Sequence, residues 1–381
     1  MSFCILPWIH TYIHPNGDVY PCCHSTSSKE SKVGNIKENS IEEIANSKKM
    51  KSLRLDMLAG VKSNMCSKCY NMEDAGIISH RIRHNKFFEK YNTVVNSTTT
   101  DGNIEPNIKF LDVRFSNLCN LKCRMCYHEL SSSIASEEKR KTIFVKSLPD
   151  YDIFEKQYTN IERIYFAGGE PLLMNEHINM LHKLINLNLS NNIDLTYNSN
   201  ITNLSFKGNN FADLWNKFKS VNISASIDAV GKRGEYIRHG INWNKIEENI
   251  NTLNKYVSIH YSLTVSTLNV ASIIDTHMYL SNNNITASNR LHLSYVMSPS
   301  YYSAKIIPNN LRKNIIADIE IYINKIKDDP FVKELSGLIT FLKNSTHDPI
   351  LFKKFLLESA KKDSLRNENL FDVLPEYKSS S

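Results

Sequence analysis

From residue 108 onward, short apolar runs alternate with longer stretches in which apolar residues recur at helical spacing. The short runs predict strands at 108–116, 161–167, 193–197, 221–227, 257–266 and 291–297. The longer stretches predict helices, most clearly at 175–189, 242–256 and 269–282. Six strand-then-helix units predict an α/β fold with a parallel sheet and outer helices, that is, an open or partial (β/α)6 barrel of the TIM-like kind.

Residues 1–91 have a different pattern and predict a small cysteine-rich module. A hairpin is expected around Asn16-Gly17, because both residue types tolerate the positive φ of a tight turn. A helix should begin after Ser40, which can form a capping box with Glu43, and should end at Gly60. The module therefore combines a short hairpin with helices.

The other boundaries follow from local composition. Residues 92–107 are polar and rich in turn-forming residues, which predicts a linker. The six-strand array occupies residues 108–300. Residues 301–381 are mostly helical in pattern and predict a helical C-terminal extension.

Composition excludes several classes of protein. The chain has 381 residues, of which 41% are apolar and 22% charged, and these are globular values. The net charge of +7 is spread along the chain and carries no nucleic-acid-binding signature, so nucleic acid is not an expected partner. No apolar stretch reaches the roughly 18 residues that span a bilayer, and the N-terminus lacks the pattern of a signal peptide, so no membrane is expected.

All eight cysteines fall within the first 126 residues, and two groups have close spacing. In a chain without an export signal, this distribution favours metal binding in a reducing cytoplasm over disulfides. One group, Cys119, Cys123 and Cys126, directly follows the first strand of the array. A closed zinc site or a fully ligated cluster needs four ligands. Three thiolates on a 4Fe–4S cluster would leave one iron open, whereas His128 would complete a zinc site.

Three further polar segments follow later strands of the array. Gly168-Gly169-Glu170-Pro171 follows the second strand, and its glycines let a ligand approach the backbone while its carboxylate can pair with an ammonium group. Asn200 follows the third strand, and Ser226 ends the fourth. Arg238 comes shortly after, and a guanidinium suits a carboxylate. An ordinary turn, an Asn-rich loop and a surface arginine are the alternatives.

Together these segments resemble the radical S-adenosylmethionine (SAM) enzymes. The resemblance implies that Cys119, Cys123 and Cys126 hold three irons and that SAM chelates the fourth. It further implies that SAM or the cluster is contacted by Tyr127, Gly168, Gly169, Glu170, Asn200, Ser226 and Arg238. Ile201 departs from the family, which usually has glycine at that position. Leu268-Asn269 would border the adenine.

The resemblance also implies a reaction. An electron from a flavodoxin-type or ferredoxin-type donor reduces the cluster, SAM is cleaved, and a 5′-deoxyadenosyl radical abstracts hydrogen from a substrate C–H. The sequence names no general acid or base. Tyr295, Pro299, Tyr301 and Tyr302 could line a substrate cavity, although a place in the core is the favoured interpretation.

The first module resembles the SPASM domain or its shorter form, twitch. Cys4, Gly17 and Cys22 have its spacing, and a Cys66-x2-Cys69 pair follows. The resemblance implies one auxiliary 4Fe–4S cluster on Cys4, Cys22, Cys66 and Cys69. Cys23 is left over and could replace Cys22 or stay a buried thiol. A four-cysteine zinc site is the alternative, and such modules usually follow the barrel rather than precede it.

Three functions stay open at this level. The first is modification of a peptide or protein side chain by oxidation, cross-linking or epimerisation, as SPASM and twitch relatives often do. The second is dehydrogenation or rearrangement of a small metabolite such as a sugar or nucleoside. The third is a metal-binding protein without catalysis, which the intact cysteines and Gly168–Pro171 disfavour.

Overall fold

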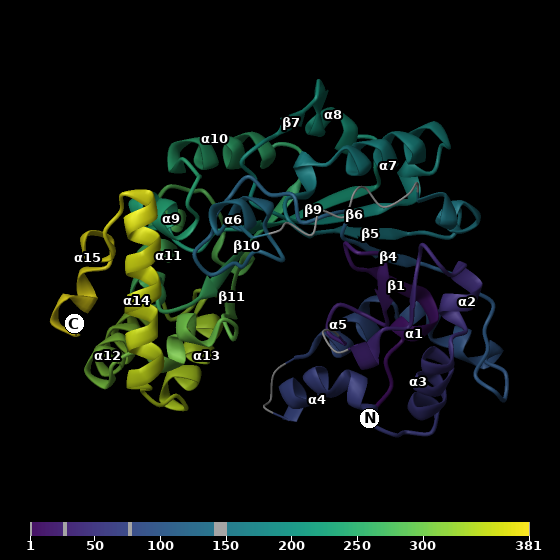
Figure 1. Cartoon of the computed structure of the whole chain (residues 1–381), viewed down its shortest axis with the longest axis horizontal. Helices are drawn as coiled ribbons and strands as arrows, with labels where there is room; N and C mark the ends of the chain where they lie inside the picture. The colour runs from purple at the N-terminus through teal and green to yellow at the C-terminus, as the bar shows by residue number, and fades with distance from the viewer. Residues whose placement is uncertain (1, 26–28, 75–77, 141–150, 381) are drawn as a thin grey trace. The chain divides into compact units, whose positions relative to one another are not determined.

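The computed structural model describes residues 2–25, 29–74, 78–140 and 151–380 as an α/β protein (Figure 1). The chain divides into two compact units. Unit 1 comprises Met1–Asn117, Phe144–Tyr197 and Asp213–Val221, and unit 2 comprises Leu118–Ile143, Asn198–Ala212 and Asn222–Ser381. Each unit has its own strands and helices, and each contains one of the two groups of cysteines.

The sheet of unit 1 joins the N-terminal module to the first strands of the array. Its strands are β1 (His10–Ile13), β2 (Asp18–Tyr20), β3 (Gly34–Asn35), β4 (Phe110–Val113), β5 (Arg163–Phe166) and β6 (Asp194–Ser199), whose last two residues belong to unit 2. Strands β1, β4, β5 and β6 run parallel, while β2 pairs antiparallel with β1 and β3 pairs antiparallel with β2. The pairing of β1 with β4 was not predicted from the sequence.

Apolar residues on one face of these parallel strands are buried under a helix. Leu111, Ile164 and Phe166 are fully buried. Phe166 packs edge-on against His177 of α7 (Asn175–Asn186), with ring centroids 4.8 Å apart. Figure 1 shows α7 lying along β5 and β6. The helix predicted at 175–189 therefore covers the sheet as a strand-then-helix unit requires.

The helices of unit 1 are short. They are α1 (Leu6–Ile9), α2 (Ile41–Ala45), α3 (Lys48–Leu58), α4 (Ser67–Asp74), α5 (His80–Phe87), α7 and the second part of α8 (Phe211–Trp215). The capping box of Ser40 and Glu43 is present, and Gly60 follows α3 with a φ of +76°. The single helix predicted between them was wrong, because the chain forms two helices. Asn46 interrupts them by exchanging two 2.9 Å hydrogen bonds with the backbone of Ile104.

Unit 2 contains the last three strands of the array. These are β9 (Ser220–Ser226, whose first two residues belong to unit 1), β10 (Ser258–Val265) and β11 (Leu291–Tyr295), and neighbouring strands pair in parallel. The accompanying helices are α6 (Ser132–Glu137), α9 (Gly231–Ile237), α10 (Trp243–Leu253) and α11 (Ile273–Asn282). All six strands predicted from the apolar runs are thus confirmed. A small antiparallel pair, β7 (Ser205–Phe206) and β8 (Asn209–Asn210), was not predicted.

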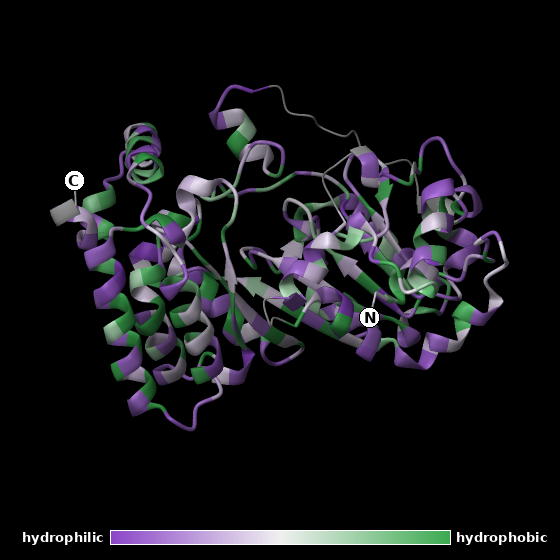
Figure 2. Ribbon diagram, turned by 90° about the horizontal axis from the view of Figure 1, so that it is seen from below, coloured by the Kyte–Doolittle hydropathy of each residue, from purple (hydrophilic) through white to green (hydrophobic). Residues whose placement is uncertain are grey.

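The C-terminal extension is helical, as predicted. It consists of α12 (Asn309–Lys325), α13 (Val332–Lys343), α14 (Pro349–Arg366) and α15 (Leu370–Val373). Figure 2 shows hydrophobic and hydrophilic residues interleaved along these helices, as expected for helices with one buried side. Tyr377 beyond α15 is fully buried and donates a 2.6 Å hydrogen bond to the carbonyl of Thr267. Among the described helices, none combines the length and apolarity needed to cross a membrane.

A buried arginine holds the irregular parts of the N-terminal module together. The Arg54 side chain on α3 is fully buried and donates to the carbonyls of Gly102 and Pro7 at 3.0 Å each and of Ala45 at 2.7 Å. Buried carbonyls need such donors, since an unpaired one costs free energy. Arg54 therefore ties three chain segments to one side chain.

Replacement of Arg54 by methionine should lower the free energy of unfolding of the protein by about 3 kcal/mol, since three buried carbonyls lose their donor at about 1 kcal/mol each. Chemical denaturation followed by circular dichroism measures the change. Lys51→Ala, which removes only the exposed ion pair between Lys51 and Asp101, should leave the free energy of unfolding nearly unchanged. Equal effects of the two substitutions would contradict this role of Arg54.

Candidate functional site

The loop that carries Cys119, Cys123 and Cys126 belongs to unit 2 and is irregular. Backbone hydrogen bonds fix it against the segment that follows α9. The amide of Lys122 donates to the carbonyl of His239 at 2.9 Å, and the amide of Arg124 donates to that of Ile237 at 2.8 Å. The loop is therefore held at a defined place although it forms neither helix nor strand.

The three thiols of this loop act on one another electrostatically. Burial, together with the neighbouring thiols of Cys123 and Cys119, raises the pKa of Cys126 to about 12. Burial also raises the pKa of Cys123, whereas Arg238 lowers it. Three neighbouring thiols are suited to a metal centre, because bound metal supplies the positive charge that stabilises thiolates.

Arg238 lies beside the cysteines and is fixed by a carboxylate. Its Nε lies 2.7 Å from Oδ2 of Asp228, and its Nη1 lies 3.8 Å from Sγ of Cys123. Burial works to lower the pKa of Arg238, but Asp228 overrides this effect, so the pKa lies above its ordinary value. Asp228 is fully buried and also accepts a 3.0 Å hydrogen bond from the amide of Thr264. The structure thus directs a permanent cation toward the predicted cluster loop.

Three predicted SAM contacts in unit 2 line a single cavity. Asn200, Ser226 and Arg238 contribute its polar groups. The rest of its lining is apolar or aromatic and comprises Ile227, Ala229, Ile241, Trp243 and Ile246. The cavity thus brings an amide, a hydroxyl and a guanidinium together beside an apolar wall.

Asn200 is tied to the cluster loop, and its neighbour explains a departure from the family pattern. The amide of Asn200 donates to Oδ1 of Asn120 at 2.9 Å, next to Cys119. Ile201 is fully buried at a φ of +48°, which is a left-handed backbone conformation that favours glycine. The carbonyl of Ile201 accepts a 2.8 Å hydrogen bond from Asn249. The residue therefore differs from the family pattern while the backbone keeps a glycine-like conformation.

The Gly168–Glu170 segment lies in unit 1 at the end of β5. Gly168 has a φ of +121°, and a Cβ added there would lie 2.9 Å from the carbonyl oxygen of Ser116. No larger residue fits without a shift of the backbone. The Glu170 side chain is buried and accepts a 3.2 Å hydrogen bond from the amide of Leu172. The carboxylate is thereby fixed at the start of the following helical turn.

Tyr127 and His128, which end the loop, are partly exposed. The Tyr127 side chain is 38% exposed, and burial of the remainder raises the pKa of its hydroxyl. His128 points to carboxylates, with Nε2 at 3.0 Å from Glu129 and Nδ1 at 3.6 Å from Glu138. The structure therefore gives no support to His128 as a fourth ligand beside the three cysteines.

The four cysteines predicted to hold the auxiliary cluster line one cavity in unit 1. The cavity is bounded by Cys4, Leu6, Cys22, His24, Ser25, Cys66, Cys69, His80 and Arg81. Burial raises the pKa of Cys22 to about 11 and that of Cys66 to about 12, and the neighbouring thiols contribute. The four sulfurs thus share one buried space whose donor set fits an iron–sulfur cluster.

Cys23 does not line this cavity. Its thiol makes a hydrogen bond to the carboxylate of Asp112 on β4, and burial raises the pKa of Cys23 well above its ordinary value. Asp112 is itself buried and lies 3.1 Å from Nε of Arg114. The geometry favours Cys22 as the ligand and makes Cys23 a buried thiol.

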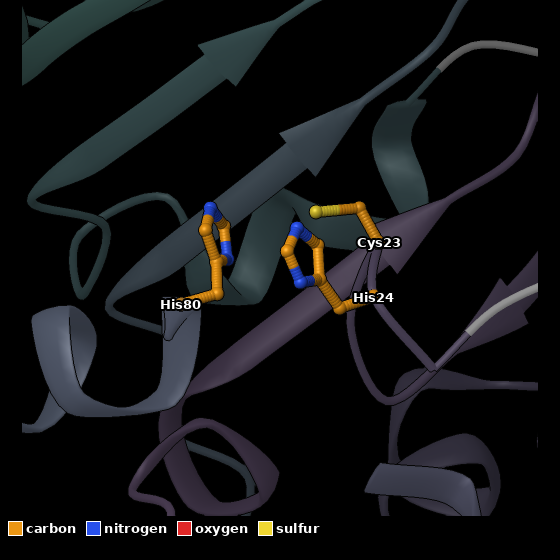
Figure 3. A group of neighbouring side chains, drawn as sticks. All are labelled: Cys23, His24 and His80. Carbon is orange, nitrogen blue, oxygen red and sulfur yellow. The ribbon is translucent and has the colours of Figure 1, made fainter. Parts of the chain in front are cut away.

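Cys23, His24 and His80 bring their ligand atoms within 4.8 Å of one another (Figure 3). Burial lowers the pKa of His24 to about 3 and that of His80 to about 4, so both rings are neutral. The rings are stacked, however, with centroids 4.2 Å apart and planes 14° from parallel. Lone pairs in two parallel planes do not converge on one ion. His24 instead places Nδ1 at 3.9 Å from Sγ of Cys69.

Sequence reasoning missed several residues of these sites. Asp228 follows Ser226 by two positions at the end of an apolar strand. An acidic residue at that position, followed by Arg238, was the signal that could have identified it. Asn120, His24 and Arg81 belong to no recognisable sequence motif, and only the fold shows that they lie at these sites. Asn269, predicted to border the adenine, donates a 2.7 Å hydrogen bond from Nδ2 to the carbonyl of Asp228.

The aromatic residues after β11 behave as the favoured interpretation predicted. Tyr302 is fully buried, and Tyr295 stacks on Phe341 with ring centroids 4.3 Å apart. Both residues are part of the packing of unit 2. Tyr302 therefore occupies a core position as predicted, whereas Tyr295, the last residue of β11, is half-buried.

Comparison with protein families gives two matches. Residues 113–278 match the model of the radical SAM superfamily, and residues 4–70 match SPASM, described as an iron-sulfur cluster-binding domain. The two matched segments contain the two groups of cysteines described above. Comparison with curated proteins gave no match.

Comparison with solved structures gives distant similarities. They include anSMEcpe with bound AdoMet (17% identity, covering 57% of this chain and 61% of that chain, TM-score 0.43). They also include SuiB of Streptococcus suis bound to S-adenosylmethionine (14% identity, 76% and 63% coverage, TM-score 0.42). A third is TYW1 with a lysine-pyruvate adduct bound (12% identity, 58% and 72% coverage, TM-score 0.34). The chain spans less than two thirds of the length of the first two.

The environments of Cys22 and Cys23 predict different effects of substitution. Cys22→Ser should lower the iron content of the anaerobically reconstituted protein by about half, because one of two four-iron clusters loses a ligand. Cys23→Ser should keep the full content, because its thiol faces Asp112. Iron and sulfide analysis measures both. If Cys23→Ser lost iron and Cys22→Ser kept it, Cys23 would be the ligand.

Proposed function

Because the chain belongs to the radical SAM superfamily and carries a SPASM domain, we propose that it is a radical SAM enzyme that modifies a peptide or protein side chain. Its cofactors are a SAM-binding 4Fe–4S cluster, SAM and an auxiliary iron–sulfur cluster. When bound, the first cluster and SAM supply a 5′-deoxyadenosyl radical that removes hydrogen from a substrate C–H. The observation that carries the proposal is the cavity of Asn200, Ser226 and Arg238 beside the cluster loop.

In this proposal Cys119, Cys123 and Cys126 hold the SAM-binding cluster, and the cavity next to them holds SAM. Arg238 offers its guanidinium to the SAM carboxylate and is kept in place by Asp228. Asn200 and Ser226 provide hydrogen bonds to the ribose. Ile227, Ala229 and Trp243 provide an apolar wall for the adenine.

The remaining predicted contact residues are proposed to bind the amino group of SAM or to pack beside the cluster. Gly168 and Gly169 present backbone groups to the SAM amino group, and Glu170 supplies a carboxylate for it. Tyr127 packs beside the cluster. Their support is the close approach of Gly168 to Ser116 and the fixed carboxylate of Glu170.

The auxiliary cluster is proposed to be held by Cys4, Cys22, Cys66 and Cys69, which share one buried cavity. An electron donor of the flavodoxin or ferredoxin type supplies the reducing electron. We propose the reducing cytoplasm as the compartment, because cysteines that bind a cluster must stay reduced.

The SPASM domain favours a peptide or protein substrate, which would be oxidised, cross-linked or epimerised, as relatives with this domain often do. A second candidate is dehydrogenation or rearrangement of a small metabolite such as a sugar or nucleoside. The observation that favours it is the single four-cysteine cavity, since relatives with one auxiliary cluster include such dehydrogenases. A gene for a short precursor peptide beside the coding gene would favour the first candidate.

Incubation of the reconstituted protein with SAM and dithionite under anaerobic conditions should yield 5′-deoxyadenosine and methionine. The 5′-deoxyadenosine forms even without substrate, because reductive cleavage requires only the reduced cluster and SAM. Liquid chromatography with mass spectrometry measures both products. Absence of 5′-deoxyadenosine from fully iron-loaded protein would overturn the proposed enzyme activity.

Substitution of one ligand in each cluster separates the roles of the two clusters. Cys126→Ala should abolish cleavage of SAM, because the cluster that binds SAM loses a ligand. Cys66→Ala should leave at least substrate-free cleavage, because this residue lies in the other cavity. The measurement is 5′-deoxyadenosine per chain over time. Equal loss in both variants would argue against separate roles.

A further inference from the structure

The C-terminal helices contact the cluster loop of unit 2 through a buried arginine. Arg124 stands between Cys123 and Cys126, and its side chain is completely buried. The match to the radical SAM superfamily ends at residue 278, so it assigns no role to the residues beyond. Several of these later residues surround Arg124.

Two carboxylates from the C-terminal region neutralise the guanidinium. Nη2 of Arg124 lies 2.5 Å from Oδ1 of Asp363 near the end of α14 and 2.5 Å from Oε2 of Glu368 beyond it. Nε donates to the carbonyl of Tyr236 at 3.0 Å, and the guanidinium lies 3.5 Å from the centroid of the Tyr236 ring. A charge so far from water persists only where partners of this kind surround it.

The same two carboxylates also form hydrogen bonds with the end of α9 and the residues after it, which contact the cluster loop. Asp363 accepts a 2.9 Å hydrogen bond from the hydroxyl of Tyr236 and a 2.7 Å hydrogen bond from the amide of Leu370. Oε1 of Glu368 lies 2.8 Å from Nδ1 of His239. The backbone carbonyl of His239 in turn accepts a hydrogen bond from the amide of Lys122. Cluster loop, α9 and C-terminal segment therefore share one closed set of polar contacts.

Two further contacts attach α14 to the loop from the same side. Nζ of Lys362 donates to the carbonyl of Arg124 at 2.9 Å. Arg366 pairs with Glu137 of α6 at 2.7 Å, and Glu137 pairs with Lys122 of the loop at 3.3 Å. Residues 362, 363 and 366 have the spacing of one helix face.

We propose that Arg124 and the segment 362–368 are positioning elements that hold the three cysteines of the loop at the spacing of the SAM-binding cluster. The backbone hydrogen bonds of Lys122 and Arg124 attach the loop at two points, and the side-chain contacts of Arg124 add to them. This inference rests on the proposed function. It makes the C-terminal extension part of the SAM-binding site, although no residue of this segment is assigned to touch the cluster or SAM.

The test compares Arg124→Gln and Asp363→Asn with the unmodified protein after anaerobic reconstitution. Each variant should lose about half of the iron, because the four-iron cluster of the loop is lost while the auxiliary cluster stays. The change that SAM causes in the electron paramagnetic resonance spectrum should disappear. Formation of 5′-deoxyadenosine should fall by about tenfold or more, as is typical for groups that orient metal ligands.

The auxiliary cluster serves as an internal control for folding, because its ligands belong to unit 1. Arg233→Gln is a matched control variant. Arg233 pairs with Glu376 at 2.9 Å in the same C-terminal region and donates to the carbonyl of Val373 at 3.1 Å, and both partners lie outside the cluster loop. This variant should keep the full iron content and the spectral response to SAM. Arg124→Lys, which keeps the charge, should restore part of the iron lost in Arg124→Gln.

Full iron content and an unchanged spectral response to SAM in both Arg124→Gln and Asp363→Asn would overturn the inference. If these variants fail to fold, Lys362→Ala decides, because it removes the bond to the carbonyl of Arg124 and otherwise a cation–π contact with Tyr302 at 5.7 Å. A weakened response to SAM supports positioning, and an unchanged one overturns it. Unmodified protein that binds both clusters but forms no 5′-deoxyadenosine would contradict the proposed function alone, since iron content and spectra still report on the loop.

Discussion

A guanidinium buried away from water sets the architecture of unit 2. Removing the charged Arg124 side chain from water costs free energy. Two carboxylates, a carbonyl and an aromatic face surround the guanidinium and offset this cost. These partners come from segments more than a hundred residues apart along the chain. Cys123 and Cys126 flank this residue, so the electrostatics of one side chain and the position of two thiols depend on the same contacts.

Unit 1 follows the same physical logic with a different set of partners. Its cysteines also lie mostly in short or irregular segments, and Arg54 connects such segments by donating to three carbonyls. Regular strands and helices provide the frame, while buried arginines fix the segments between them. A metal cluster that binds to such segments then adds covalent ligation to a framework already formed by hydrogen bonds.

Much of the fold could be predicted because it depends on local patterns. Six apolar runs gave the six strands, and the motifs at their ends gave residues that share a cavity, namely Asn200, Ser226 and Arg238. What could not be predicted depends on contacts distant in sequence. The break at Asn46 is caused by Ile104, and the partners of Arg124 lie more than a hundred residues away. Such pairs leave no periodic signal in either segment.

The parallel pairing of β1 with β4 has a consequence for how the N-terminal module can be treated. Tyr12 stands opposite Asp112, and Ile13 opposite Val113, so the module supplies the neighbour that completes one side of β4. A chain shortened to begin after the module would present an open strand edge of buried, apolar residues. Such edges recruit other chains into intermolecular sheets. The module is thus also a cover against aggregation, and excision of it would lower solubility as well as remove the cysteines of the auxiliary cluster.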